Sequence, residues 1–111
     1  MIAKEQVLTF KKSADKVFED KDYTSATILY FKAWFALQDL ILFQKTGKVP
    51  KDHSERFRLL EKVFPKIYEK LNTEFLTYRE TYSRILDKAT CDRIRRIVED
   101  EISFYLSQKA S

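Results

Sequence analysis

The residues from Tyr23 to Gln44 constrain the fold more than any other part of the chain. This stretch contains no glycine or proline and, at roughly two dozen residues, is far too long for a strand, so it predicts a helix. A helix that is apolar on most sides needs neighbours on most sides, or a membrane. The apolar run is shorter than the roughly 20 residues of a membrane span and carries charges at Lys32 and Asp39. We therefore expect the central helix of a soluble bundle, with no membrane contact.

Further helices are predicted on both sides of this central one. Residues 3–19 carry apolar side chains at three- and four-residue steps, and Asp22 can cap the central helix after a short polar link. So short a link predicts an antiparallel hairpin of the first two helices. At the other end, Gly47 suits a helix C-terminus because it tolerates the left-handed backbone conformation.

The second half of the chain predicts three shorter helices. Asp52 and Glu55 have capping-box spacing, so a third helix is expected to begin there and to break near Phe64. Pro65 suits a first helical turn, which places a fourth helix from Pro65 to about Asp87. Its buried stripe is predicted to consist of Leu71, Phe75, Tyr78, Tyr82 and Ile85. Thr90 is expected to cap a fifth helix.

Composition limits the fold class and the chemistry. With 111 residues the chain is predicted to be one domain over residues 1–111, and one glycine and two prolines leave little turn chemistry. We expect an all-α antiparallel bundle of four to five helices with a long central apolar second helix. Cys91 is the only cysteine, so no intrachain disulfide and no cysteine-based zinc site is expected. No cofactor is expected, and because the N-terminus lacks a signal-peptide core we expect a cytoplasmic protein.

Three segments carry patterns that occur together in one known family. They are the aromatic and alanine-rich residues 23–37, the link at 50–54 (PKDHS) and the run at 78–84 (YRETYSR). In order and spacing these segments resemble the second helix, the link to the third helix and the arginine-bearing part of the fourth helix of HEPN domains, which are small helical bundles. The resemblance covers nearly the whole chain.

This resemblance implies two classes of function. HEPN domains include metal-independent ribonucleases, many of them toxins, and non-catalytic members that bind nucleotides, RNA or partner proteins. The catalytic members carry an arginine followed after four to six residues by a histidine. An imidazole that titrates near neutrality can move the proton of an RNA 2′-hydroxyl, and a guanidinium can pair with the scissile phosphate.

The chain departs from the catalytic pattern after Arg79. Arg84 occupies the position after four intervening residues, and an arginine stays protonated near neutral pH. Tyr82 is a poor base because the unperturbed pKa of tyrosine is about 10. The only histidine is His53, which lies in the link segment. The resemblance therefore implies a non-catalytic, homodimeric module that binds a nucleotide, RNA or a small nucleotidyltransferase, in a pair of the toxin–antitoxin type.

The candidate binding residues are Arg79, Arg84, Tyr82 and His53, and no residue is assigned to catalysis or to a metal. Arg93 and Arg96 share a helix face and extend one basic surface if the last two helices are adjacent, although nearby acidic residues also predict an ordinary salt-bridged surface. Two alternatives remain open at this point. One is a metal-independent endoribonuclease that uses Arg79 with His53 or Tyr82, and the other is a structural bundle without a ligand.

Overall fold

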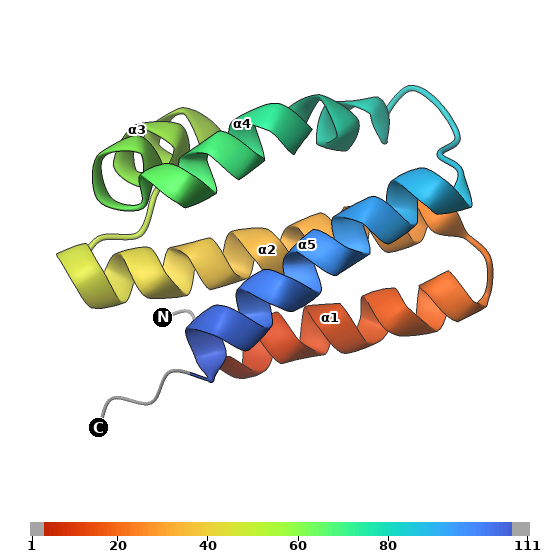
Figure 1. Cartoon of the computed structure of the whole chain (residues 1–111), viewed down its shortest axis with the longest axis horizontal. Coiled ribbons are helices and arrows are strands. Elements are labelled where there is room, and N and C mark those ends of the chain that lie inside the picture. The colour runs from red at the N-terminus through yellow and green to blue at the C-terminus, as the bar shows by residue number, and fades with distance from the viewer. Residues whose placement is uncertain (1–3, 108–111) are drawn as a thin grey trace.

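The computed structural model describes residues 4–107, and these residues form five helices and no strand (Figure 1). The all-α prediction is confirmed. The expected start of the first helix at Ala3 lies outside the described residues. The helices are α1 (Lys4–Glu19), α2 (Tyr23–Thr46), α3 (His53–Val63), α4 (Pro65–Glu80) and α5 (Lys88–Leu106).

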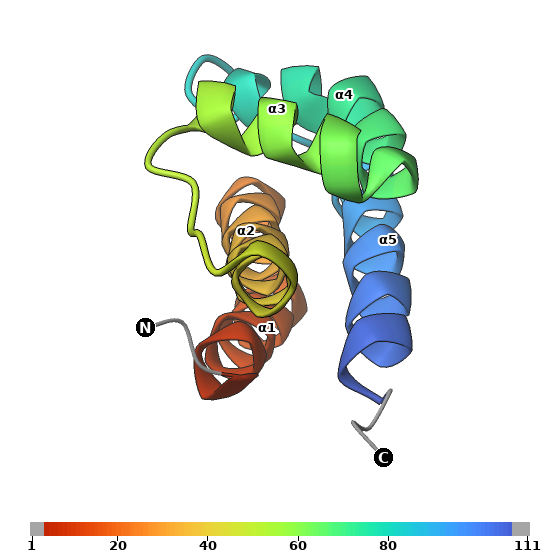
Figure 2. The same ribbon diagram turned by 90° about the vertical axis from the view of Figure 1, so that its left-hand side faces the viewer.

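The helices form two layers. In the first layer α1 and α2 lie side by side as the predicted antiparallel hairpin, and α5 crosses over them and packs mainly on α2 (Figure 1). In the second layer α3 and α4 pack against each other and lie across α2 and α5, as Figure 2 shows from the side. The two layers are joined by the segment 47–52 and by the loop 81–87.

Helix α2 is the core of the molecule, as its composition predicts. Twelve of its residues are buried, among them Tyr30, Phe31, Trp34 and Phe35. By length and composition alone α2 would pass as a membrane span, and 67% of its most apolar window is buried inside the bundle. Such burial is what the central helix of a bundle shows.

Both predicted ends of α2 are confirmed. The Asp22 side chain accepts a hydrogen bond from the backbone N–H of Ser25, over 3.1 Å, at the N-terminus. At the C-terminus Gly47 adopts the left-handed conformation with φ 75°, and its N–H donates to the carbonyl of Phe43 over 2.8 Å. This conformation is unfavourable for a residue with a Cβ atom, which explains the only glycine of the chain.

The predicted break between the third and fourth helices is also confirmed. The Asp52 side chain accepts from the N–H of Glu55 over 2.8 Å and so caps α3. Phe64 leaves the helical conformation, and Pro65 is the first residue of α4, where its missing N–H removes no helical hydrogen bond. The direct succession of the two helices folds α3 back against α4.

The predicted end of the fourth helix is wrong. Helix α4 ends at Glu80, and residues 81–87 form a turn and an extended loop instead of two further helical turns. Thr81 ends the helix, because its hydroxyl donates to the carbonyl of Tyr78 over 2.6 Å while the backbone tightens into three-residue steps. Tyr82 and Ile85, predicted to be buried, are therefore 75% and 90% exposed.

The loop after α4 is anchored by Leu86. This side chain is only 2% exposed, and its backbone N–H donates to the hydroxyl of Thr24 on α2 over 2.7 Å. Asp87, not Thr90 as predicted, then caps α5, because its carboxylate accepts from the N–H of Thr90 over 2.9 Å. The loop thus fixes where α5 begins on α2.

Polar bridges connect the two layers. Glu101 of α5 is 4% exposed and accepts from the indole N–H of Trp34 on α2 over 3.2 Å. Its second oxygen accepts from Lys70 of α4 over 3.0 Å. A buried carboxylate is costly unless it is paired and hydrogen-bonded. Lys70 therefore holds α4 to the first layer at this point.

Candidate functional site

Arg79 lies in the last turn of α4, beside a hollow between α3 and α4. The hollow has a volume of about 380 Å³. Within residues 4–107 the Arg79 side chain has no ion pair and no hydrogen bond, and it is exposed. An unpaired guanidinium beside a hollow is available to an anionic ligand. The lining residues are Phe57, Tyr68, Asn72, Phe75, Leu76 and Arg79.

The hollow is built from one face of α4 and one side chain of α3. Tyr68, Asn72, Phe75 and Arg79 follow one another at three- and four-residue steps and so share a face of α4. Phe57 of α3 closes the other side. Its ring contacts Tyr68 and Phe75 edge to face, with centroids 6.1 Å and 5.1 Å apart. The floor of the hollow is therefore aromatic, and polar groups lie at its rim.

His53 lies on the other side of Phe75, at the start of α3. Its imidazole packs among the rings of Phe35, Phe75 and Tyr78, with centroids 4.7, 5.3 and 5.8 Å away. Phe75 is thus shared between the histidine cluster and the Arg79 hollow. His53 is not among the residues that line the Arg79 hollow, so the structure does not bring the two side chains into one site.

Besides these rings, the Arg56 side chain also contacts the His53 imidazole. Its Nε donates to Nδ1 of His53 over 3.3 Å, so Nδ1 is the acceptor and Nε2 carries the proton. Burial lowers the pKa of His53, and the neighbouring Arg56 charge lowers it further. The imidazole is therefore a neutral ring whose lone pair is already engaged.

Sequence reasoning missed the network around Arg56. This side chain is 6% exposed, and its Nη1 donates to the Phe35 carbonyl, to Gln38 and to Asp39 over 3.2, 3.3 and 2.7 Å. Burial raises the pKa of Asp39 despite the pairing with Arg56. The sequence carried a usable signal, because Gln38 and Asp39 are two polar residues inside the most apolar stretch and need a buried partner.

Tyr78 lies between Tyr82 and His53, because its ring contacts both side chains. The rings of Tyr78 and Tyr82 contact edge to face, and their hydroxyl oxygens are 2.9 Å apart. Burial and the Tyr82 hydroxyl raise the pKa of Tyr78 to about 12. A phenol of this pKa stays protonated near neutral pH and is not a base.

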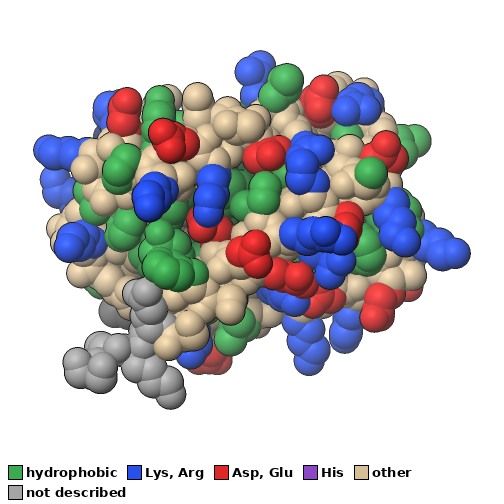
Figure 3. Space-filling view, viewed as in Figure 1, with side chains coloured by type: hydrophobic (Ala, Val, Ile, Leu, Met, Phe, Trp, Pro, Cys, Tyr) green, Lys and Arg blue, Asp and Glu red, His purple; other side chains and the backbone are tan. Residues whose placement is uncertain are grey.

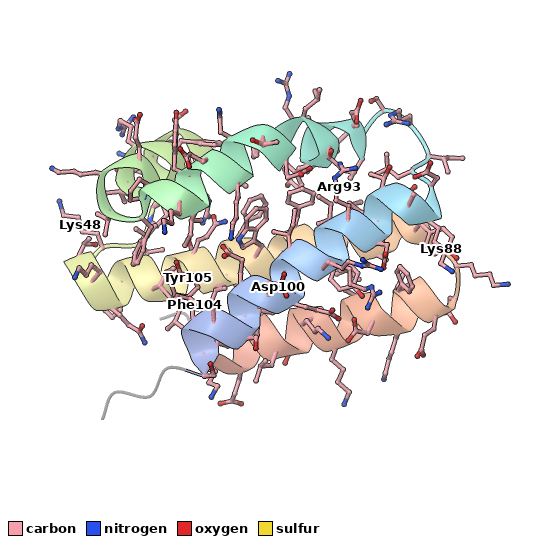
Figure 4. All side chains as sticks on the ribbon, in the orientation of Figure 1. Lys48, Lys88, Arg93, Asp100, Phe104 and Tyr105 are labelled. Carbon is pink, nitrogen blue, oxygen red and sulfur yellow. The ribbon has the colours of Figure 1, made fainter. Side chains whose placement is uncertain are left out.

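Arg84 does not join Arg79. It lies on the loop after α4, where its guanidinium pairs with Glu80 over 3.1 Å. Arg93 also pairs, with Glu74 over 3.0 Å, and Figure 4 shows it pointing from α5 to α4. Arg96 pairs with Asp92.

Of the two arrangements predicted for these arginines, one basic surface or an ordinary salt-bridged surface, the structure shows the salt-bridged surface. On the face seen in Figure 3, Lys and Arg side chains lie among Asp and Glu side chains. No extended basic track of the kind that binds a long nucleic acid is visible on that face.

The Arg79 hollow is distinguished from the others by its walls. A hollow of about 430 Å³ is lined by five residues of α3 alone, four of them charged: Glu55, Arg58, Leu59, Glu61 and Lys62. The Arg79 hollow joins two helices and combines three aromatic rings with an unpaired arginine, whereas two further hollows, at Lys32 and at Lys45, each combine two aromatic rings with a lysine. Among residues 4–107 there is no group of three His, Cys, Asp or Glu side chains that could hold a metal ion.

Comparisons of the chain with family models, with curated proteins and with solved structures found no match in any of the three.

Proposed function

We propose that the chain is a non-catalytic binding module that takes a nucleotide or RNA in the Arg79 hollow. The observation that carries this proposal is the unpaired Arg79 guanidinium at the rim of a hollow with an aromatic floor. This pairing of groups corresponds to the two parts of a nucleotide. A guanidinium matches the oxygens of a phosphate, and aromatic side chains provide surfaces for a base.

The size of the hollow supports the same ligand. Small-molecule sites typically enclose about 300–1,000 Å³ and combine apolar walls with a few polar groups. The hollow lies at the lower end of this range, at about 380 Å³. Leu76, which is 63% exposed at its rim, would lose contact with water when a base is bound.

The surroundings of His53 support a non-catalytic role. A general base needs a free lone pair within reach of the proton that it removes. The Nδ1 lone pair of His53 accepts from Arg56, and Nε2 carries the proton. The Tyr82 hydroxyl contacts that of Tyr78, whose pKa is raised to about 12. The ribonuclease alternative would therefore require the Arg56–His53 contact to open.

The test is a titration of the purified protein with adenosine 5′-monophosphate and with a short single-stranded RNA. Loss of a charge-assisted hydrogen bond to phosphate is worth about 1.4 kcal/mol, so Arg79→Ala should weaken binding about tenfold. Arg84→Ala is the matched control, since it removes the same charge from a guanidinium that is paired with Glu80. It should change affinity less than about twofold. Equal weakening by both variants, or by neither, would contradict the proposal.

We also propose the homodimer that the HEPN resemblance implies, and the nucleotidyltransferase-like partner stays an expectation from that resemblance. Two large apolar side chains on the loop after α4 support an interface, because Tyr82 and Ile85 are 75% and 90% exposed. Light scattering after gel filtration should give twice the mass of the chain, and Ile85→Asp should give a monomer. Leu8→Asp, which alters an exposed leucine of α1, is the control. A monomeric wild type would contradict the dimer.

A further inference from the structure

We infer that the Arg79 hollow takes one phosphate group only, so that it recognises a nucleoside monophosphate unit, free or within RNA, and gains no affinity from the further phosphates of a triphosphate. This inference rests on the proposed function and narrows its ligand class. The reason is the number of positive charges available to a ligand in the hollow.

Arg79 is the only cation among the residues that line the hollow. The two other polar lining residues, Tyr68 and Asn72, are uncharged. Neither side chain has a hydrogen bond within residues 4–107, so both can donate to a ribose or to a base without losing a partner. The hollow therefore offers one positive charge and two neutral polar groups.

The neighbouring arginines and Lys70 cannot add charge without breaking ion pairs. On α3, Arg56 is held by Asp39 and Arg58 lies 3.9 Å from Glu55. On α4, Lys70 is held by the buried carboxylate of Glu101. Arg84 on the following loop pairs with Glu80. Each of these cations is already partnered by an acidic group.

The residues that line the hollow also include no glycine-rich loop of the kind that holds a triphosphate. Proteins bind the β- and γ-phosphates with glycine-rich loops, helix N-termini and a magnesium ion held by oxygen ligands. The only glycine, Gly47, lies at the C-terminus of α2 and outside the hollow. Arg79 lies at the C-terminal end of α4, where the partial negative charge of the helix disfavours a highly charged anion.

The helix geometry fits a ligand of one nucleotide in length. Asn72 and Arg79 are seven residues apart, which corresponds to about 10 Å along a helix axis. Side chains of a helix lean toward its N-terminus, so Arg79 leans back over Phe75 and Leu76 toward Asn72. A base can lie on these two side chains with its phosphate at Arg79.

The test compares ligands that differ in phosphate number. Adenosine mono-, di- and triphosphate are titrated in the presence of a chelator, together with the dinucleotide ApA, which carries a single phosphodiester. We expect the monophosphate and the triphosphate to bind within about threefold of each other. Binding of ApA at similar strength would indicate RNA as a source of the ligand, whereas binding of the monophosphate alone would indicate a free nucleotide; either outcome supports a single-phosphate site.

A salt titration with an octanucleotide RNA measures the number of phosphates directly, provided that ApA binds. For single strands the logarithm of the affinity falls with the logarithm of salt concentration with a slope of about −0.7 per phosphate contact. One contact predicts a slope of about −0.7, reduced toward zero in Arg79→Gln and kept in Arg79→Lys.

Two outcomes would overturn the inference. A triphosphate that binds more than tenfold tighter than the monophosphate, or a slope near −2, would show that further cations take part. Failure of every probe to bind would instead contradict the proposed function itself. Since Arg79 is exposed, the variants should fold, and unchanged helical circular dichroism checks this.

Discussion

Nε of Arg56 donates a hydrogen bond to Nδ1 of His53 over 3.3 Å, and this contact defines the state of the only histidine. A protonated imidazole has no acceptor at Nδ1 and would face the Arg56 guanidinium with a like charge. The contact therefore exists only with a neutral imidazole. It also engages the lone pair that a general base at His53 would need.

The contact predicts a pH dependence of stability. The pKa of His53 is lowered in the folded protein by burial and by Arg56, whereas in the unfolded chain it is near its ordinary value of about 6.5. Between these two pKa values the unfolded state binds more protons, so the free energy of unfolding decreases as the pH falls below about 6.5. Urea unfolding at pH 7.5 and pH 5.5 measures this decrease.

His53→Gln is the control for this prediction, because glutamine does not titrate. The variant should lose most of the difference between the two pH values. Asp39, whose pKa is raised, contributes with the opposite sign and at lower pH. A wild type that is as stable at pH 5.5 as at pH 7.5 would contradict a neutral, engaged His53.

Removing Arg56 from its network should lower the free energy of unfolding strongly. Arg56→Ala leaves the buried acceptors of Gln38 and Asp39 without their donor, and breaking a buried ion pair costs about 3 kcal/mol. In the background Asp39→Asn the same substitution should cost less, because no buried charge is left unpaired. Arg58→Ala, on the exposed side of α3, should cost less than about 0.5 kcal/mol. Equal decreases in the free energy of unfolding for Arg56→Ala and Arg58→Ala would contradict a stabilising role of the network.

Trp34 reports on the bridge between the two layers. It is the only tryptophan, it is fully buried, and its indole N–H donates to Glu101, which Lys70 neutralises. Lys70→Met should lower the free energy of unfolding by about 2 kcal/mol, because a buried carboxylate loses its cation. The loss should shrink in the background Glu101→Gln, where that charge is absent. Urea unfolding followed by Trp34 fluorescence gives both values, and identical losses would show that the pair is not coupled.

The effect of replacing Gly47 on stability should depend only on the backbone conformation at this position. Its φ of 75° is unfavourable for any residue with a Cβ atom, but no atom lies within 4 Å of the position that a Cβ would take. Gly47→Ala should therefore cost about 1 kcal/mol from backbone conformation alone. Gly47→Asn should cost less, since asparagine tolerates this conformation better. Thermal unfolding of the two variants should show this order, and a neutral Gly47→Ala would disprove the conformational argument.

Sequence reasoning was successful where the relevant interactions are local. The apolar circumference of α2 predicts its central position, and the caps at Asp22, Gly47 and Asp52 depend on residues within four positions. It failed at the end of α4, where the hydrogen bond from Leu86 to Thr24 joins residues 62 positions apart. Helical periodicity continues through Tyr82 and Ile85, but the anchored loop takes both out of the helix.

The candidate site was predictable in part. The pattern at 78–84 predicts Arg79 as a binding residue, and the structure leaves its side chain unpaired beside a hollow. The spacing of Tyr68 and Asn72 ahead of Arg79 could have been read as one helix face. The contribution of Phe57 could not have been predicted from the sequence, because it depends on how α3 folds back on α4. Arg84 was selected on sequence grounds alone, and Glu80 engages it.

The hollow between α3 and α4 is proposed to bind one nucleotide through Arg79. Amide chemical-shift mapping during a titration with adenosine 5′-monophosphate tests this claim most directly. We predict that the largest shifts fall on Phe57, Tyr68, Asn72, Leu76 and Arg79, with saturation, and that Arg79→Ala needs about tenfold more ligand to reach the same shifts. Shifts that cluster elsewhere, for example around Arg93 and Glu74, or the absence of any saturating shift, would contradict the account.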